Sequence, residues 1–250
     1  MREDSKLLPA KINDLFTLCD KRCAPQFSAF LDGGEQAVIE DEFRIPCGYN
    51  VMLFGGFDSA ERKLFGVFPE WSEPEKEEFP IAAVRFKTPD FRTLTHRDYL
   101  GTLMSLGIDR NKTGDILADK DGAYVFVAAD IAEYVMRNVT KIANTGVTSQ
   151  IVDIADIELT APQTREYECV CASLRLDAVM AGAYGISRAN AEKLIHAGCV
   201  KVNHREVTDR SKQLNAGDLL SVRGYGRCVL KDTGVKTRSG RLHITVEKFV

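Results

Sequence analysis

The sequence predicts an α+β fold in which each part has its own pattern of apolar residues. Residues 1–78 combine helical spacing with a strand pair, residues 79–160 alternate strand-like and helix-like segments, and residues 168–250 pair short helices with strands. The chain is 250 residues long and 44% hydrophobic, which is enough for a sizeable core divided among small domains. We therefore expect domains at 1–78, 79–160 and 168–250.

The N-terminal part, residues 1–78, is expected to be a helical and hairpin subdomain. Its first helix is predicted from the helical spacing of apolar residues, which are Ile12, Leu15, Phe16 and Cys19. The expected elements are a first helix beginning near Pro9, helices over 24–30 and 35–42, and strands over 51–54 and 63–68. The glutamate-rich segment that follows, residues 69–80, is expected to be a solvated linker, with a functional acidic patch as the alternative.

The middle part has the element order β-α-β-β-α-β, which is the ferredoxin-like arrangement shared by RNA-recognition motifs. The expected elements are strands over 81–87, 114–118, 123–128 and 150–154, and helices over 96–106 and 130–143. Tyr124 and Phe126 stand two apart on one strand, so they share a face on which bases could stack. We favour packing over stacking for these rings, since the first strand offers no matching aromatic residue. Thr95 and Asp98 are expected to cap a helix rather than form a catalytic pair with His96.

The C-terminal part begins with a pair of short amphipathic helices. The apolar face of each helix follows i, i+3, i+4, i+7 spacing. It consists of Leu176, Val179, Met180 and Ala183 in the first helix and of Ala191, Leu194, Ile195 and Gly198 in the second. The first helix is expected to stop near Gly185, and Ser187 is expected to cap the second. Arg188 then lies in a first turn, where the helix dipole mildly disfavours a cation. A phosphate bound by the helix start and this guanidinium would explain its position, and an indifferent exposed arginine is the alternative.

Charge is strongly polarised along the chain although its net value is only −3. Residues 165–250 carry 15 Lys and Arg against 9 Asp and Glu, whereas residues 1–164 carry 18 against 27. The basic residues expected on strands and turns of the C-terminal part are Lys201, Arg205, Arg210, Lys212, Arg223, Arg227, Lys231, Lys236, Arg238 and Arg241. Such a concentration of cations favours binding to a nucleic-acid backbone.

Residues 175–227 closely resemble the RNA-binding domain named after ribosomal protein S-four, also called the αL motif. The matching segments are the Arg-Leu-Asp helix start at Arg175, the Ser-Arg-x-x-Ala helix at Ser187, the Gly-x-Val-x-Val-Asn hairpin at 198–203 and the Gly-Asp strand at 217–220. The chain departs from the family pattern at His204, where glycine is usual. Because Asn-Gly suits a two-residue type I′ turn better than Asn-His, we expect a longer turn that uses Arg205.

Further segments resemble the signatures of the YlmH family of bacterial RNA-binding proteins, so the similarity covers nearly the whole chain. These segments are Gly55–Arg62, Leu94–Gly101, Gly114–Ile116 and Ser221–Arg227. The resemblance implies a cytosolic bacterial protein that binds the large ribosomal subunit carrying peptidyl-tRNA and assists ribosome-associated quality control. The implied partners are rRNA and tRNA, and we expect no cofactor, no membrane and no small-molecule substrate.

The hypothesis at this stage is a non-catalytic RNA-binding factor without a metal site. Its expected RNA contacts are Arg175, Ser187, Arg188, Lys193, Lys201, Asn203, His204, Arg205, Arg223 and Arg227. The enzymatic alternative is a pseudouridine synthase, because such enzymes often carry the same RNA-binding domain and their catalytic motif also contains Arg-Leu-Asp, which makes Asp177 a tempting nucleophile. However, Arg-Leu-Asp here starts the first helix of the RNA-binding domain itself, and only residues 231–250 follow that domain, too few for a catalytic domain. A methyltransferase is disfavoured by the lack of a glycine-rich loop after a strand. A third alternative is a protein-interaction adaptor that uses the acidic N-terminal half.

Cysteine usage and the N-terminus indicate a reduced, cytoplasmic protein. The 7 cysteines are odd in number and irregularly spaced, unlike a secreted disulfide framework. No apolar run near Met1 is long enough for a signal peptide or a membrane span. Cys169 and Cys171 share a strand face and could bind a metal with His196 or His204, but buried packing explains them adequately.

Overall fold

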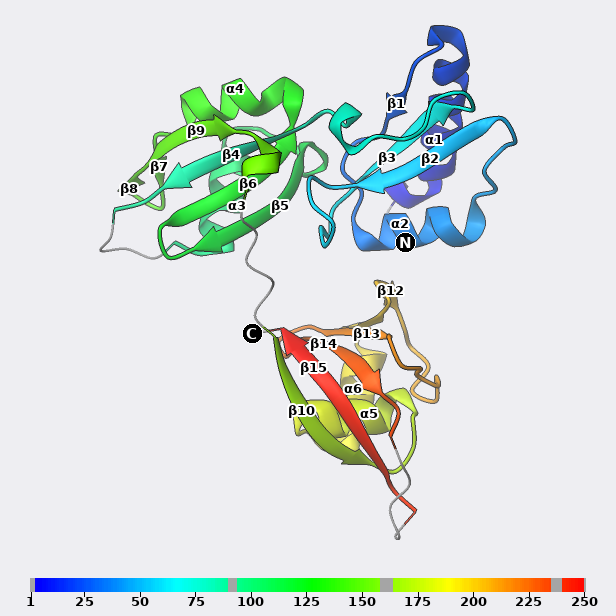
Figure 1. Cartoon of the computed structure of the whole chain (residues 1–250). Coiled ribbons are helices and arrows are strands. Elements are labelled where there is room, and N and C mark those ends of the chain that lie inside the picture. The colour runs from blue at the N-terminus through cyan, green and yellow to red at the C-terminus, as the bar shows by residue number, and fades with distance from the viewer. Residues whose placement is uncertain (1–2, 90–93, 158–163, 235–239, 250) are drawn as a thin grey trace. The chain divides into compact units, whose positions relative to one another are not determined.

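A computed structural model of the chain describes residues 3–89, 94–157, 164–234 and 240–249. It confirms the α+β fold and divides the chain into compact units at residues 1–158 and 159–250 (Figure 1). The further division of the first unit at residues 78 and 79 stays a proposal from the sequence.

The N-terminal part of the first unit contains an antiparallel sheet in the order β1-β3-β2. Its elements are α1 (Glu3–Arg22), β1 (Gln26–Phe27), α2 (Gly33–Glu42), β2 (Tyr49–Phe54) and β3 (Leu64–Pro69). The expected hairpin and the helix near 35–42 are confirmed, and Asp32 caps α2 through hydrogen bonds to the N–H groups of Gly34 and Glu35.

Two expectations in this part are wrong. The first helix begins well before Pro9, because the buried stripe of Ile12 and Phe16 already includes Leu8. The helix expected over 24–30 is instead the short strand β1, which pairs with β3. Pro25 disfavours helical backbone in the residue before it and has no N–H to donate, so the extended form is the easier one here.

The middle part has the ferredoxin-like topology expected from the sequence, with all sheet neighbours antiparallel in the order β5-β6-β4-β9. Its elements are η1 (Lys76–Glu78), β4 (Ile81–Lys87), α3 (His96–Ser105), η2 (Arg110–Lys112), β5 (Thr113–Asp119), β6 (Gly122–Ala128), α4 (Ala129–Asn138), β7 (Lys141–Ile142), β8 (Thr145–Gly146), β9 (Thr148–Val152) and η3 (Ile154–Asp156). Helix α4 ends earlier than expected, since the chain turns directly into the β7–β8 hairpin.

The sheet face that carries Tyr124 and Phe126 is used for packing. Phe126 is fully buried and its ring lies 5.0 Å from that of Phe57. A Cβ atom on Gly56 would come within 2.5 Å of the Phe126 ring, so glycine is required for the close approach of this loop. Tyr124 is half-buried beneath the Arg85 guanidinium, which lies 4.4 Å from the ring centre. The stacking platform considered from the sequence is therefore wrong for Phe126.

Two family-like segments of the first unit, residues 55–62 and 114–116, meet at the carboxylate of Asp115. Its oxygens accept hydrogen bonds from the backbone N–H groups of Glu61 at 2.6 Å and Arg62 at 3.2 Å. The Arg62 guanidinium donates to the carbonyl oxygens of Thr113 and Phe30, each at 2.9 Å. These contacts tie the loop after β2 to β5, so the segments 55–62 and 114–116 serve the packing of this unit. The capping box between Thr95 and Asp98 likewise confirms the structural interpretation of that segment.

The C-terminal unit packs a helix pair on one face of an antiparallel sheet in the order β10-β15-β14-β13-β11-β12 (Figure 1). Its elements are β10 (Thr164–Cys171), α5 (Leu176–Tyr184), α6 (Arg188–His196), β11 (Val200–Val202), β12 (Arg205–Glu206), β13 (Leu219–Val222), β14 (Gly226–Asp232) and β15 (Leu242–Phe249). The predicted apolar helix faces meet the sheet in one core, where Met180 and Ile195 are fully buried. Both helix boundaries predicted from Gly185 and Ser187 are confirmed.

The hairpin between β11 and β12 has a two-residue turn, so the expected longer turn is wrong. Val202 pairs with Arg205, and the turn residues Asn203 and His204 have φ values of 48° and 65°. Asparagine tolerates this left-handed conformation, and its side chain is held by Asp218 at 2.7 Å and by the N–H of Leu219 at 2.8 Å. These bonds fix the turn and force His204 into a conformation that glycine would adopt without strain.

Replacing His204 with glycine is therefore expected to stabilise the C-terminal unit by about 1 kcal/mol, which raises the Tm by roughly 4–8 °C for a domain of this size. Calorimetric unfolding of the full chain would measure the shift. His204→Ala is the matched control, because alanine keeps a Cβ atom at the positive φ and should give no comparable gain. A lower Tm for the glycine variant would contradict this account of the turn.

Candidate nucleic-acid interface

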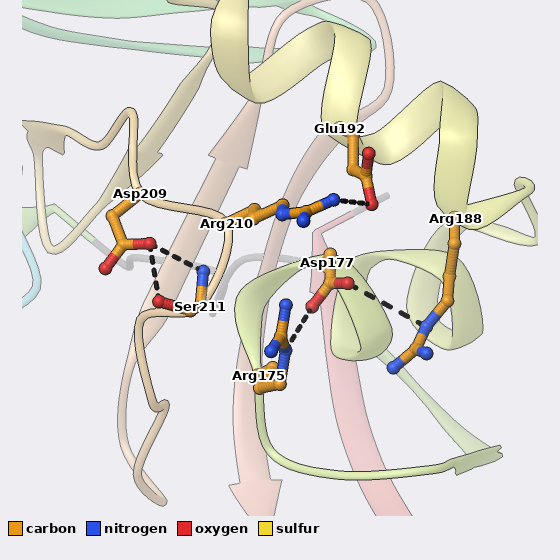
Figure 2. A network of polar contacts seen from close by, with 7 residues as sticks. All are labelled: Arg175, Asp177, Arg188, Glu192, Asp209, Arg210 and Ser211. Carbon is orange, nitrogen blue, oxygen red and sulfur yellow. Dashed lines mark hydrogen bonds and ion pairs between the residues drawn. The ribbon is translucent and has the colours of Figure 1, made fainter.

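The starts of α5 and α6 meet at a buried carboxylate, that of Asp177 (Figure 2). Only 4% of its side chain is exposed. One oxygen accepts a hydrogen bond from Nε of Arg175 at 3.1 Å, and the other lies 3.9 Å from Nε of Arg188. Asp177 thus joins the residue before α5 to the first residue of α6, and it lies in the first turn of α5, where the helix dipole favours an anion.

The two arginines are anchored by Asp177 at Nε while much of each side chain remains in solvent. Arg175 is 36% exposed and Arg188 is 50% exposed. Ser187 caps α6 by accepting a hydrogen bond from the N–H of Asn190 at 3.2 Å, and the side chains around this helix start are exposed. A phosphate could therefore reach both the guanidinium of Arg188 and the start of α6.

The loop before β13 braces the same region. The carbonyl oxygens of Arg210 and Lys212 accept hydrogen bonds from the backbone N–H groups of Asp177 and Leu176. The Arg210 side chain pairs with Glu192 of α6 at 2.5 Å. Within the loop, Asp209 accepts bonds from the Oγ and N–H of Ser211, and these bonds hold the pKa of that carboxyl below its usual value. Figure 2 shows this second set of contacts beside the Asp177 pair.

A second basic region, which we call the sheet groove, lies across β11, β13 and β14. Lys201 is paired with Ser221 and Ser221 with Arg227, so their side chains follow one row across the strands. The groove has a volume of about 290 Å³. It is lined by Gly198, Cys199, Lys201, Ser221, Val222, Arg223, Gly224, Gly226 and Arg227.

The residues predicted from the sequence thus fall into distinct groups. Arg175, Ser187 and Arg188 gather at the helix starts, whereas Lys201, Arg223 and Arg227 line the sheet groove. The remaining predicted residues lie elsewhere: Lys193 is exposed on α6, His204 and Arg205 belong to the β11–β12 hairpin, and Asn203 is engaged with Asp218. Lys236 and Arg238 lie outside the described residues.

Sequence reasoning missed two residues of this region. Asp177 was weighed only as a catalytic group, and its role in holding two arginines becomes visible only when α5 and α6 are packed together. Tyr225 is 42% exposed on the turn between β13 and β14. An aromatic residue between two arginines, in the segment Arg223-Gly-Tyr-Gly-Arg227, was the signal that could have identified it.

The cysteines considered as metal ligands are packed into the C-terminal core. Burial raises the pKa of Cys169 to about 11 and also raises the pKa of Cys171, which favours the neutral thiol over the thiolate that a metal requires. In the described ranges, no cluster of three His, Cys, Asp or Glu side chains is suited to a metal ion. The described helices likewise include none that is both long and apolar enough to cross a membrane.

Two family models match the chain, one in each compact unit. Residues 74–156 match the family described as "Putative RNA-binding domain in YlmH", and residues 174–220 match the S4 domain. The chain is 34% identical over 220 residues to ribosome-associated protein quality control protein P2 of Bacillus subtilis strain 168, covering 88% of this chain and 85% of that protein. A solved structure, cell division protein ylmH from Streptococcus pneumoniae, is similar in fold with a TM-score of 0.50 at 18% identity, covering 62% of this chain and 95% of that one.

Replacing Asp177 with asparagine is expected to destabilise the C-terminal unit by about 1–3 kcal/mol, because the buried group loses a charge-assisted hydrogen bond. Hydrogen–deuterium exchange of the full chain should show faster exchange in the peptides that cover α5 and α6. Glu168→Gln is the control, since it removes an exposed carboxylate from β10 of the same unit. Equal exchange in the two variants would contradict the anchoring role of Asp177.

Proposed function

The chain belongs to the YlmH family of RNA-binding proteins, and from this premise we propose that it binds structured rRNA and tRNA on the large ribosomal subunit without catalysing a reaction. The observation that carries this proposal is the pair of arginines, Arg175 and Arg188, held by Asp177 at the starts of α5 and α6. Arginine forks and helix N-termini are both suited to phosphate oxygens.

The polarised charge of the chain supports an electrostatic mode of binding. The excess of Lys and Arg lies in the unit that contains the S4 domain, and the sheet groove places three further cations on that unit. In this proposal Arg188 and Lys193 contact phosphates along α6, while Lys201, Arg223 and Arg227 extend the contact across the sheet. Folded RNA is then recognised by its backbone and shape.

The proposed setting is ribosome-associated quality control in the bacterial cytoplasm. It rests on the name of the Bacillus subtilis relative and on the length over which the two chains align. In this role the protein holds a large subunit that carries peptidyl-tRNA long enough for another factor to act. Specific contacts with rRNA and tRNA belong to the same proposal.

The environment of Asp177 argues against its use as a nucleophile. A nucleophilic carboxylate must reach the substrate, yet this side chain is 4% exposed and both of its oxygens face arginine nitrogens. Its backbone N–H is also bonded to the loop before β13, which fixes its position. These contacts support a structural role and favour the non-catalytic proposal over a pseudouridine synthase.

Neutralising Arg188 and Lys193 together, as Arg188→Gln with Lys193→Gln, is expected to weaken binding to large ribosomal subunits about tenfold or more at physiological salt. For the unmodified chain, about five neutralised phosphates give a slope of log K against log salt near −3.5 to −4.5. The double variant should be shallower by about 1.4–1.8, which titrations at several salt concentrations would measure.

The control for net charge is Lys11→Gln with Lys21→Gln, a pair of exposed lysines on α1. It should leave both affinity and slope nearly unchanged. A flat salt dependence of the unmodified chain would count against the proposal, and so would equal losses in the two double variants. An adaptor that uses the acidic half would retain its partner in the Arg188 and Lys193 variant.

The non-catalytic role has its own test, in which purified protein is incubated with ribosomal RNA and the RNA is analysed for modified bases. No turnover is expected. A modification that the unmodified chain makes and Asp177→Asn abolishes would overturn the proposal, provided that the variant still binds RNA.

A further inference from the structure

The sheet groove has the chemistry of a phosphate site. Its lining includes the glycines Gly198, Gly224 and Gly226 and the cationic residues Lys201 and Arg223. Within the described part of the chain, neither Lys201 nor Arg223 forms an ion pair. Two cations without a carboxylate partner, in a hollow with a hydroxyl group from Ser221, are arranged to bind an anion.

Opposing charges near the groove limit which ligand can bind. Glu206 is opposite Lys201 in the hairpin, and its Oε1 would lie 2.7 Å from a Cβ atom on Gly198. The carboxyl end of α6 also leads into Gly198, and the helix dipole is unfavourable to anions there. Because Glu206 and the carboxyl end of α6 both weaken the attraction for an anion, we expect the ligand to make contacts other than those of its charge.

Tyr225, which is next to the groove residues in the chain, could provide such a contact. It lies between two glycines that line the groove, Gly224 and Gly226, and it is 42% exposed. Asn190 of α6 donates a hydrogen bond to the Tyr225 hydroxyl at 3.3 Å, and the ring meets Tyr184 edge to face at 5.9 Å. The Tyr184 hydroxyl in turn donates to the carbonyl oxygen of Gly226 at 3.3 Å. Tyr225 is therefore an exposed ring whose position is fixed before a ligand arrives.

We propose that the sheet groove and Tyr225 together bind one unpaired nucleotide of an RNA strand. The phosphate enters the groove beside Lys201 and Arg223, and the adjoining base stacks on the Tyr225 ring. A base in a duplex is already stacked on both faces, so this contact selects a single-stranded or flipped-out nucleotide. The inference rests on the proposed function and adds to it a site for unpaired RNA at the sheet groove, next to the start of α6 that Asn190 belongs to.

The test compares binding of the full chain to a single-stranded oligouridylate and to a blunt-ended RNA duplex whose strands have the same length, because such a duplex has no unpaired nucleotide. Tyr225→Ala is expected to weaken oligouridylate binding about 5- to 150-fold, the range for loss of one base–aromatic stack, and to leave duplex binding nearly unchanged. Tyr225→Phe keeps the ring and loses only the bond to Asn190, so it should retain most of the affinity. Arg223→Gln should weaken oligouridylate binding and lower its salt slope by about 0.7.

A fluorescence measurement reports the stack directly. Trp71 is the only tryptophan of the chain, so Trp71→Phe combined with Tyr225→Trp leaves a single reporter at the proposed site. Its emission should be quenched by oligouridylate and much less by inorganic phosphate or uridine monophosphate. Equal affinity for the mononucleotide and the oligonucleotide would identify a site for free nucleotides and overturn the proposal for RNA.

The outcomes separate this inference from the proposed function. Suppose that Tyr225→Ala and Arg223→Gln leave the affinity for both RNAs unchanged, while Arg188→Gln with Lys193→Gln lowers it. The groove proposal is then wrong and the proposed function stands. If Tyr225→Ala weakens both RNAs equally and Tyr225→Phe does the same, Tyr225 acts through the structure of the domain and the proposal is again wrong. If no variant changes binding to either RNA, both proposals fail.

Discussion

The C-terminal unit depends on one buried carboxylate at the junction of its two helices. Asp177 is nearly inaccessible, yet its charge is matched by arginines that reach it from outside the core. A buried charge without partners is strongly unfavourable, so the carboxylate requires Arg175 and Arg188 to stay close. The same contacts that satisfy Asp177 hold both guanidinium groups at the helix starts, and folding thereby prepares the surface proposed to bind phosphate.

The sequence predicted elements best where apolar spacing and capping residues agreed. The ferredoxin-like order, the helix pair and the cap at Ser187 all followed from local patterns. Contacts between distant segments were not predictable in this way. Strand β1 forms because β3 is available as a partner, and the two-residue turn that contains His204 is stabilised by a bond from Asn203 to Asp218, which lies just before β13. Local propensity alone favoured a different outcome in both places.

The candidate site was likewise predictable where local patterns set it and unpredictable where contacts between distant segments did. Charge and helix position identified Arg175, Ser187 and Arg188, which the structure brings together. Asn203 was predicted to contact RNA from its place on the hairpin side, which stays a prediction; the structure adds that its side chain bonds to Asp218 and Leu219 and fixes the hairpin. The row from Lys201 through Ser221 to Arg227 depends on strand register, which is set by pairing across the sheet. The sequence alone could not show that these side chains line one groove.

The most direct test of the account is site-specific crosslinking at the start of α6. A photoreactive amino acid at Ala189, an exposed residue beside Arg188, would be introduced into the full chain and irradiated with intact ribosomes. We expect crosslinks to RNA of the large subunit, mapped by sequencing, and few from the same probe at Lys11 of α1. Crosslinks from Ala189 to ribosomal proteins alone, or equal RNA crosslinking from both positions, would contradict the claim that the starts of α5 and α6 bind RNA.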